Sequence, residues 1–482
     1  MNVINTKEKI WRVISCFFLL IEIVIFCSFG FQIQKLVPIK YMILYGSVAC
    51  VLIIASIFFT FKMVKGAKSG LVVIVFMIVT TSVLLVGQYM IGKAQSTIDN
   101  VTANGEEVTS EIILLVRKDS EISNVTDIGE FLVGYLKSDS GFVDYIIEEI
   151  NSLLGQEPNY VEFEDVFSMV DALYSKTANV IILDKAYMDV IGEVEGYESF
   201  QDDVREIYSK EIVNYIRLVE KNKDLTQFVV YVSGIDRFGA VSATSRSDVN
   251  LLLAVNTETK EIQMINTPRD YYVPLANSNG VKDKLTHAGL YGVDNSIATL
   301  EMLYDVEIDY YVRMNFSGFE GIIDALGGID VYSEYDFTVE PIKHYTKGIN
   351  HVTGLEALAF ARERHSFAKG DIQRGENQME VVKATIQKAL SKEILYNYTE
   401  VLEDVSGIFQ TNMTSEEIYQ LVKMQLSDMA TWDMNTYSVT GTGSMSTTYS
   451  MPNRNVYVMN PNQQQVEEAQ KLLMDVLEGK DK

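Results

Sequence analysis

The chain has 482 residues, a formal net charge of −25 and 48% hydrophobic residues. This length allows two or three domains, and the excess of acidic residues argues against a protein that binds the phosphates of nucleic acid. The three cysteines, Cys16, Cys27 and Cys50, fall in apolar segments, so we expect neither disulfides nor thiol chemistry in the remainder of the chain.

Three apolar segments lie in residues 1–92, at 13–33, 41–61 and 71–90. Each has about twenty residues, which is enough to cross a hydrocarbon core of about 30 Å as a helix. A cleaved signal peptide explains the first segment less well, because its apolar stretch is too long and two further segments follow. We therefore predict a membrane region of three helices.

Basic residues predict the orientation of this region. Six lysines and arginines lie at the N-terminus and in the second loop, against three in the first loop and after the third segment. The positive-inside rule then places the N-terminus in the cytoplasm and the C-terminal domains outside the cell. Glu22 lies within the first segment, where we expect a protonated or paired carboxyl rather than a functional one.

Residues 101–482 hold 31 basic and 62 acidic side chains, a net charge of −31. Such a domain should repel nucleic acid and anionic surfaces. An anionic ligand would therefore need a concentrated local site of positive charge.

The polar segment 93–110 is predicted to be a linker, and an accessory domain is predicted at 111–215. Strand-like and helix-like runs alternate in it, which indicates a small α/β domain with a largely parallel sheet. We predict strands at 111–117, 160–164 and 179–184, and helices near 126–136, 141–154 and 165–176.

Residues 116–150 of this module resemble part of one lobe of a solute-binding protein. A single lobe lacks the facing lobe that would close on a ligand. We therefore favour a spacer or docking role for the module over binding of a small molecule.

The last domain is predicted at 216–482. A strand at 226–236 precedes two apolar runs that flank the turn TETK, which indicates a β-hairpin. Thr353 with Glu356, and Thr414 with Glu417, have the spacing of capping boxes and predict two helix starts. We expect an α/β/α domain with a mixed central sheet.

Only twelve arginines occur in the chain, and five of them fall in three short motifs of this domain. The motifs lie at ends of predicted strands or helices, where functional side chains of such folds usually project. These five residues are Arg246, Arg269, Arg362, Arg364 and Arg374.

The stretch ARERHSFAKGDIQRGENQ, residues 361–378, contains three of these arginines. We expect the preceding helix to end near Phe360 and the chain to continue in an extended conformation. In an extended chain every second side chain lies on the same side, so Arg362 and Arg364 should point the same way. Two adjacent guanidinium groups suit bidentate capture of phosphate oxygens.

A second helix is predicted to begin at Asp371 as its N-cap. On this helix Arg374 and Gln378 are four residues apart and share one face. The stretch is therefore predicted to contain the end of one helix, a connection that carries arginines, and the start of a second helix.

Two carboxylates, Asp236 and Asp248, lie at the end of one predicted strand and the start of the next. Oxygen ligands beside an arginine cluster are typical of a magnesium site that takes its remaining ligands from phosphate and water. Taken singly, each is better explained by a structural role, Asp236 as the cap of a turn and Asp248 as the partner of Arg246; taken together with the arginines, the set favours the functional site.

The order of motifs resembles the LytR-CpsA-Psr family of cell-wall ligases over residues 226 to about 480. The motifs are GID at 234–236, RSD at 246–248, PRD at 268–270, ARER at 361–364 and DIQRGENQ at 371–378. Three membrane segments and an inserted module resemble the capsule-associated branch of that family.

The resemblance implies transfer of an envelope polymer, here a capsular polysaccharide, from an undecaprenyl pyrophosphate carrier to a sugar hydroxyl of peptidoglycan, forming a phosphodiester. It implies that Asp236 and Asp248 hold Mg²⁺, with Mn²⁺ as an alternative, and that either carboxylate is a candidate acceptor for the hydroxyl proton. The residues implied to bind or position the pyrophosphate are Arg246, Arg269, Arg362, Arg364, Gln378, Asp371, Arg374 and Lys284.

The polyprenyl tail would need an apolar slot near the bilayer. One candidate wall consists of Phe316, Phe319, Ile322, Ile323 and Leu326, although apolar residues at this spacing more often belong to the core. The alternative functions are a polyprenyl-pyrophosphate hydrolase and a non-catalytic membrane regulator that docks other capsule-assembly proteins; a nucleic-acid partner is not expected.

Overall fold

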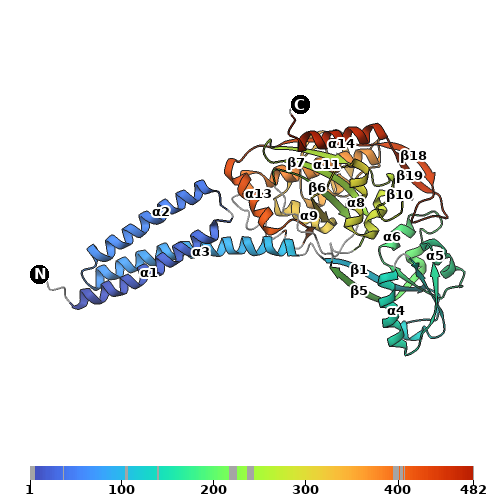
Figure 1. The fold of residues 1–482 in the computed structure, drawn as a ribbon, viewed down its shortest axis with the longest axis horizontal. Coiled ribbons are helices and arrows are strands. Elements are labelled where there is room, and N and C mark those ends of the chain that lie inside the picture. Colours follow the sequence, from blue (N-terminus) through green and yellow to red (C-terminus); the bar gives the residue numbers. More distant parts are fainter. Residues whose placement is uncertain are drawn as a thin grey trace. The chain divides into compact units, whose positions relative to one another are not determined.

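The computed structural model (Figure 1) describes residues 6–35, 37–103, 107–137, 140–215, 225–235, 244–394, 401, 405 and 408–480. The chain divides into two compact units, which we describe separately. The first contains Met1–Thr102, Ile386–Ser406 and Met413–Thr431, and the second contains Ala103–Thr385, Gly407–Asn412 and Trp432–Lys482.

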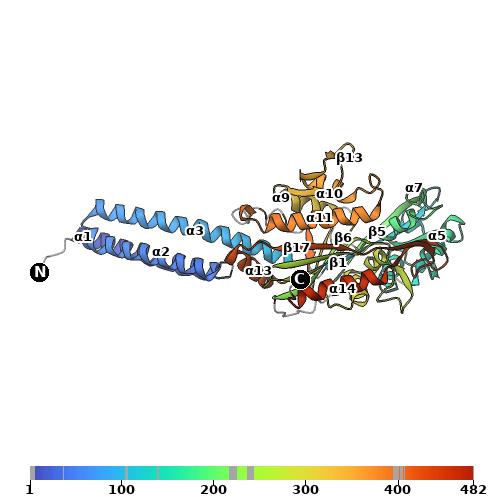
Figure 2. The same cartoon turned by 90° about the horizontal axis from the view of Figure 1, so that it is seen from above.

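Three long apolar helices dominate the first unit: α1 (Thr6–Ile33), α2 (Ile39–Phe58) and α3 (Ala67–Ala103). A short π-helix at Phe59–Met63 continues α2. The three helices lie side by side (Figures 1 and 2), and each has a segment long and apolar enough to cross a membrane. The three predicted membrane helices are therefore confirmed as helices, and the orientation stays a prediction.

Glu22 is buried among these helices. Its carboxyl accepts a hydrogen bond of 2.6 Å from the Thr80 hydroxyl of α3. A carboxyl that is shielded and hydrogen-bonded agrees with the paired side chain expected at this position.

Helix α3 continues through residues 93–103, where the sequence predicted a linker. These last turns pack against α13 (Ser415–Asp428), which begins at the predicted capping box of Thr414 and Glu417. Ile98 is buried against Tyr419, whose hydroxyl donates to the Gln95 carbonyl oxygen at 3.2 Å. Because α13 lies more than three hundred residues further along the chain, local composition gave no sign of this support for the helix.

The accessory sheet of the second unit has the strand order β3-β2-β4-β1-β5. Strand β2 is parallel to β3 and β4, and β1 is antiparallel to β4 and β5, so the sheet is mixed rather than largely parallel. Its strands are β1 (Glu107–Arg117), β2 (Leu132–Leu136), β3 (Asn159–Phe163), β4 (Val180–Asp184) and β5 (Val204–Tyr215), and its helices are α4 (Ser140–Leu154), α5 (Val166–Tyr174), α6 (Tyr187–Gly192) and α7 (Phe200–Asp203).

The helix predicted at 126–136 is a 3₁₀ turn at Val125–Asp127 followed by strand β2. The segment enters the sheet by pairing with both β3 and β4. A Cβ atom at Gly134 would lie 2.8 Å from the Phe163 ring, so a larger residue there would force that ring to move.

A six-stranded sheet forms the centre of the last domain, in the order β16-β11-β6-β7-β8-β17. Two pairs, β11 with β6 and β17 with β8, are parallel and the others antiparallel, as predicted for a mixed sheet. The strands are β6 (Gln227–Ile235), β7 (Ser247–Asn256), β8 (Glu261–Asn266), β11 (Tyr310–Met314), β16 (Phe409–Thr411) and β17 (Asp433–Ser438).

Helices cover both faces of this sheet. Figure 2 shows α10 (Gly354–Arg362) and α11 (Asp371–Ala389) on one side and α14 (Gln463–Leu477) on the other. With α14, helix α8 (Val293–Tyr304) buries Leu300 and Tyr304 against sheet residues such as Tyr231. The predicted α/β/α architecture is therefore confirmed.

Smaller elements surround this core. They are β9 (Tyr272–Pro274), β10 (Lys282–Lys284), a 3₁₀ helix at Leu285–Tyr291, α9 (Phe316–Ala325), β12 (Ile329–Ser333), β13 (Phe337–Val339), β14 (Lys343–Tyr345), β15 (Gly348–Val352), β18 (Gly441–Ser446) and β19 (Val456–Pro461).

The accessory domain and the last domain share one hydrophobic core within the second unit. Tyr187 and Ile191 of α6 belong to the same buried cluster as Met451 and Val458. The backbone N–H of Thr244 donates to the Thr109 carbonyl oxygen at 2.8 Å. These contacts join the accessory domain to the last domain within the second unit.

Candidate active site

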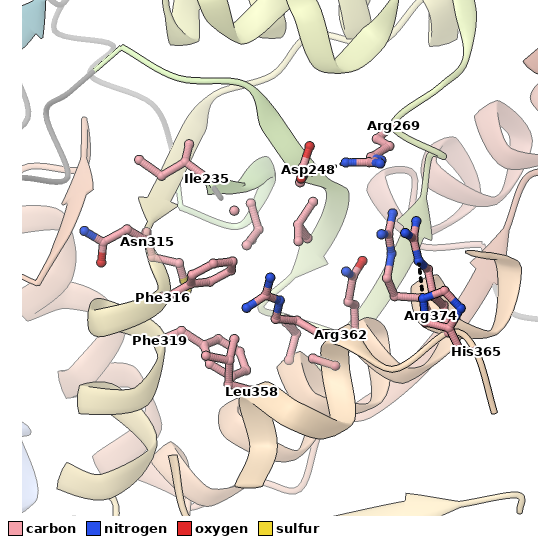
Figure 3. A pocket seen from close by; sticks show the side chains of 18 of the residues that line it. Ile235, Asp248, Arg269, Asn315, Phe316, Phe319, Leu358, Arg362, His365 and Arg374 are labelled. Atoms are coloured by element: carbon pink, nitrogen blue, oxygen red, sulfur yellow. Dashed lines mark hydrogen bonds and ion pairs between the residues drawn. The ribbon is translucent and has the colours of Figure 1, made fainter. Parts of the chain in front are cut away.

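A cavity of about 350 Å³ lies where β6 and β11 end and β7 begins. The remaining walls come from α9, from the end of α10 and from the first turns of α11 (Figure 3). Its lining residues are Glu193, Val232, Gly234, Ile235, Asp248, Val249, Arg269, Met314, Asn315, Phe316, Phe319, Leu358, Ala361, Arg362, Arg364, His365, Arg374, Gln378 and Val382.

Arg269 and Asp248 form the centre of the cationic end of this cavity. The Arg269 Nη1 lies 2.9 Å from Oδ2 of Asp248, and the Thr286 hydroxyl donates to Oδ1 at 3.0 Å. The buried Nε of Arg269 makes no hydrogen bond within the part of the chain that the structure describes, since Asp270 lies 3.9 Å away. A buried donor of this kind is available to an anion.

Burial alone would raise the pKa of Asp248, but the positive charges of Arg269 and Arg246 outweigh it and hold the pKa below its usual range. The same carboxylate helps to raise the pKa of Arg269 against the opposite effect of burial. Both groups are therefore charged at neutral pH.

Helix α11 places Arg374 and Gln378 on one face toward the cavity, as predicted. Asp371, in the first turn of the helix, pairs with Arg374 at 2.6 Å. Gly375 lets this turn lie against the sheet, because a Cβ atom there would lie 2.1 Å from Nδ2 of Asn266. Burial lowers the pKa of Arg374, and Asp371 acts in the opposite direction.

Helix α10 ends at Arg362, two residues later than predicted, and Glu363 is extended. The two additional residues stay helical because the N–H of Glu363 donates to the Ala359 carbonyl oxygen at 3.1 Å. Arg362 and Arg364 nevertheless both line the cavity. The Arg362 guanidinium stands 4.3 Å from the centre of the Phe316 ring, a cation–π contact.

The opposite end of the cavity is apolar. Ile235, Phe316, Phe319 and Leu358 lie together on the side away from Arg374, with Arg362 between the two ends (Figure 3). Of the wall predicted from the sequence, Phe316 and Phe319 line the cavity. Ile323 and Leu326 are buried in the core, and Ile322 is not among the lining residues.

Six of the predicted site residues thus come together in one cavity: Asp248, Arg269, Arg362, Arg364, Arg374 and Gln378. Lys284 lies elsewhere, because β10 pairs with β9 and directs this lysine to Asp270, at 3.1 Å. Asp236 lies outside the described residues.

Arg246 is also absent from the lining of the cavity, and a residue that the sequence analysis missed stands in its place. Glu193, at the end of α6 in the accessory domain, lines the cavity and pairs with Arg246 at 2.6 Å. No sequence signal singled it out, because it is one of 65 acidic residues and lies in a different module.

Asp248 has the hard oxygen ligands that Mg²⁺ prefers. One of its oxygens is paired with Arg269 and the other accepts from Thr286, and each keeps a second lone pair. Among the described residues no group of three or more His, Cys, Asp and Glu side chains is arranged to hold a metal ion. Asp248 therefore fits one position of the predicted magnesium site, and the metal stays a prediction.

Residues 191–475 match the LytR_cpsA_psr family, which is more than half of the chain. A Bacillus cereus (strain AH820) relative named polyisoprenyl-teichoic acid–peptidoglycan teichoic acid transferase TagU is 33% identical over 230 residues, 47% of this chain and 75% of the relative. The Bacillus subtilis (strain 168) transferase TagT of the same description is 31% identical over 276 residues, 55% and 81% of the two chains.

Two solved structures match a similar share of this chain. A crystal structure of B. subtilis TagV is 28% identical, covers 53% of this chain and 99% of its own, and has a TM-score of 0.45. A structure described as TagT bound to LIIa-WTA is 27% identical, covers 54% and 95%, and has a TM-score of 0.42. The capsule-associated branch stays a prediction. From the family match and the two relatives, the chain belongs to the LytR-CpsA-Psr family.

Proposed function

We propose that this protein transfers an envelope polymer from a polyprenyl pyrophosphate carrier to a sugar hydroxyl of peptidoglycan. The observation that carries the proposal is one cavity with arginines at one end and aromatic and aliphatic side chains at the other. A lipid pyrophosphate has the same two halves, a dianionic head and an apolar tail. The names of the related TagU and TagT proteins, and membership of the family, support the same reaction.

In this reaction the acceptor hydroxyl oxygen attacks the phosphorus that bears the polymer. A new P–O bond forms, the bond to the lipid-side phosphate breaks, and its electron pair leaves with the polyprenyl monophosphate. Phosphoryl transfer needs positioning and neutralisation of charge more than covalent help, and a single well-placed arginine can contribute roughly 10³ to 10⁵ in rate. We assign this role to Arg269, Arg362, Arg364 and Arg374.

The hydroxyl proton must leave as the new bond forms. Asp248 is a weak base while it is paired with Arg269, because that pairing holds its pKa low. Asp236 is the other candidate base. We further propose that Asp236 and Asp248 hold Mg²⁺, or alternatively Mn²⁺, which when bound would neutralise charge on the phosphate oxygens.

Two polymers are candidates for transfer, a teichoic acid and a capsular polysaccharide. The related TagU and TagT proteins are named for teichoic acid, whereas the three apolar helices and the accessory module are the basis for our prediction of a capsular polysaccharide. The cavity would recognise the lipid pyrophosphate that either polymer carries. Donors bearing a teichoic-acid unit or a capsular repeat, offered in parallel, would separate the two.

The test is a transfer assay with full-length protein in nanodiscs, a labelled polyprenyl-pyrophosphate glycan and purified peptidoglycan. We expect label on the peptidoglycan with wild type and with Lys471→Gln, which removes an exposed charge on α14 outside the cavity, and a loss of at least a hundredfold with Arg374→Gln. Release of the labelled phosphorylated glycan into solution, unaffected by the acceptor, would identify a hydrolase. Wall attachment that survives Arg362→Ala and Arg374→Gln in cells would support the non-catalytic regulator instead.

A further inference from the structure

Glu193 belongs to the accessory domain, yet it lines the cavity of the last domain. It follows directly on α6, whose residues Tyr187, Val190 and Ile191 are buried in the core that the two domains share. A second set of contacts holds the domains together nearby, including Arg454 with Asp171 at 3.0 Å. The position of Glu193 is therefore built into the interface between the domains.

The two carboxylate oxygens of Glu193 face two arginines. Oε2 lies 2.6 Å from Nη1 of Arg246, and Oε1 lies 3.9 Å from Nη1 of Arg269. The carboxylate is thus an ion-pair partner of Arg246 and only a neighbour of Arg269, and Nη1 of Arg246 makes no well-aligned hydrogen bond among the described residues. A phosphate oxygen that reached Arg246 would take the place of Oε2. Arg246, with its side chain only 6% exposed, is not among the residues that line the cavity.

The Glu193 side chain has space to move outward, away from Arg246. Its side chain is 46% exposed, and together with Arg246 it lines an adjoining outer cavity of about 450 Å³. Asp189, Glu198 and Asp202 also line that outer cavity. Their negative charge disfavours the outward position of Glu193, so the carboxylate stays on Arg246 until a stronger anion replaces it.

We propose that Glu193 is a displaceable anion, by which the accessory domain controls access of the lipid pyrophosphate to Arg246. This inference rests on the proposed function. A phosphate of the incoming lipid displaces the carboxylate from Arg246, and Glu193 turns toward the outer cavity. When the reaction has removed one of the two phosphates, Glu193 returns to Arg246 and favours release of the polyprenyl monophosphate.

The experiment measures binding of undecaprenyl pyrophosphate to the full-length protein in nanodiscs. Glu193→Gln keeps the shape of the side chain and removes the competing charge, so we expect its Kd to fall about tenfold, the size of effect expected when one close, partly screened charge is removed. Asp202→Asn is the matched control. It removes one of the charges that oppose the outward turn of Glu193 but leaves the carboxylate on Arg246, so any tightening is a weak long-range effect and should change the Kd less than twofold.

A double-mutant cycle shows whether the effect acts through Arg246. In an Arg246→Gln background, with folding checked by thermal unfolding, Glu193→Gln should leave the Kd unchanged. If that background does not fold, the comparison with Asp202→Asn decides alone. Weaker or unchanged binding by Glu193→Gln, or equal tightening by Asp202→Asn, would overturn the inference while leaving the proposed function intact. Failure of the wild type to bind the lipid pyrophosphate would overturn both.

Discussion

Asp248 is the acidic group on which the cationic end of the cavity most depends. Both of its oxygens are engaged, one by Arg269 at 2.9 Å and one by the Thr286 hydroxyl at 3.0 Å. In Asp248→Asn the amide oxygen can still accept from Thr286. The amide nitrogen then faces the Arg269 guanidinium, donor against donor, and leaves that arginine without its closest anion.

The expected loss follows from burial. Removing one partner of a buried ion pair costs about 3 to 5 kcal/mol. The side chains of Asp248 and Arg269 are 14% and 15% exposed, so some solvent screening remains and we expect about 2 to 4 kcal/mol. For a domain of this size that corresponds to a fall in Tm of roughly 5 to 10 °C.

The loss should also depend on pH. Because the pKa of Asp248 is lower in the folded protein than in the unfolded chain, its contribution is complete above the unfolded pKa of about 3.9 and disappears as the pH falls through the folded pKa. Thermal unfolding of wild type and Asp248→Asn at pH 7, 5, 4 and 3 measures this. A difference in Tm that is absent at pH 7, or that persists undiminished at pH 3, would refute the assignment of Asp248 as a charged partner of Arg269.

Three other changes give separate outcomes. Arg269→Lys keeps the charge but loses the planar fork, so the single-turnover transfer rate should fall about a hundredfold; a rate within threefold of wild type would contradict its role. Phe319→Ala should raise the KM for an undecaprenyl donor about tenfold and leave kcat unchanged, and equal effects on a donor with a much shorter lipid would argue against an apolar slot. Tyr419→Phe removes the hydroxyl that donates to Gln95 and should lower the free energy of unfolding by about 1 kcal/mol with no change in transfer; lost transfer at unchanged stability would be the contrary result.

Much of the fold could be predicted because its signals are local. The strand β7 reads as a continuous apolar run with turn residues on both sides, and the capping boxes at Thr353 and Thr414 mark the two helix starts where the structure has them. The wrong predictions concern segments whose structure depends on contacts with residues distant in the sequence. Residues 132–136 form a strand because they pair with β3 and β4, and residues 93–103 stay helical where Ile98 packs on Tyr419.

In the candidate site, too, the residues that could be predicted are those with a local sequence signal. Arg362, Arg364, Arg374 and Gln378 could be placed together because one short stretch of chain carries them. Lys284 could not be excluded, because only the pairing of β10 with β9 shows that it faces Asp270. The partner of Arg246 could not be found either, since it comes from another domain and no local pattern marks it.

The charge of the surrounding domain explains why these arginines occur as pairs. Three arginine–carboxylate pairs lie at or beside the cationic end: Asp371 with Arg374, Asp248 with Arg269, and Glu193 with Arg246. At these three arginines an incoming phosphate therefore competes with a carboxylate. Asp371 is held on the same helix as its arginine, and Asp248 is largely buried with a second hydrogen bond to Thr286. Glu193 is the most exposed of the three acids and lies directly after α6, on neither the helix nor the strand of its arginine, so it is the one that a phosphate can replace at the lowest cost in free energy.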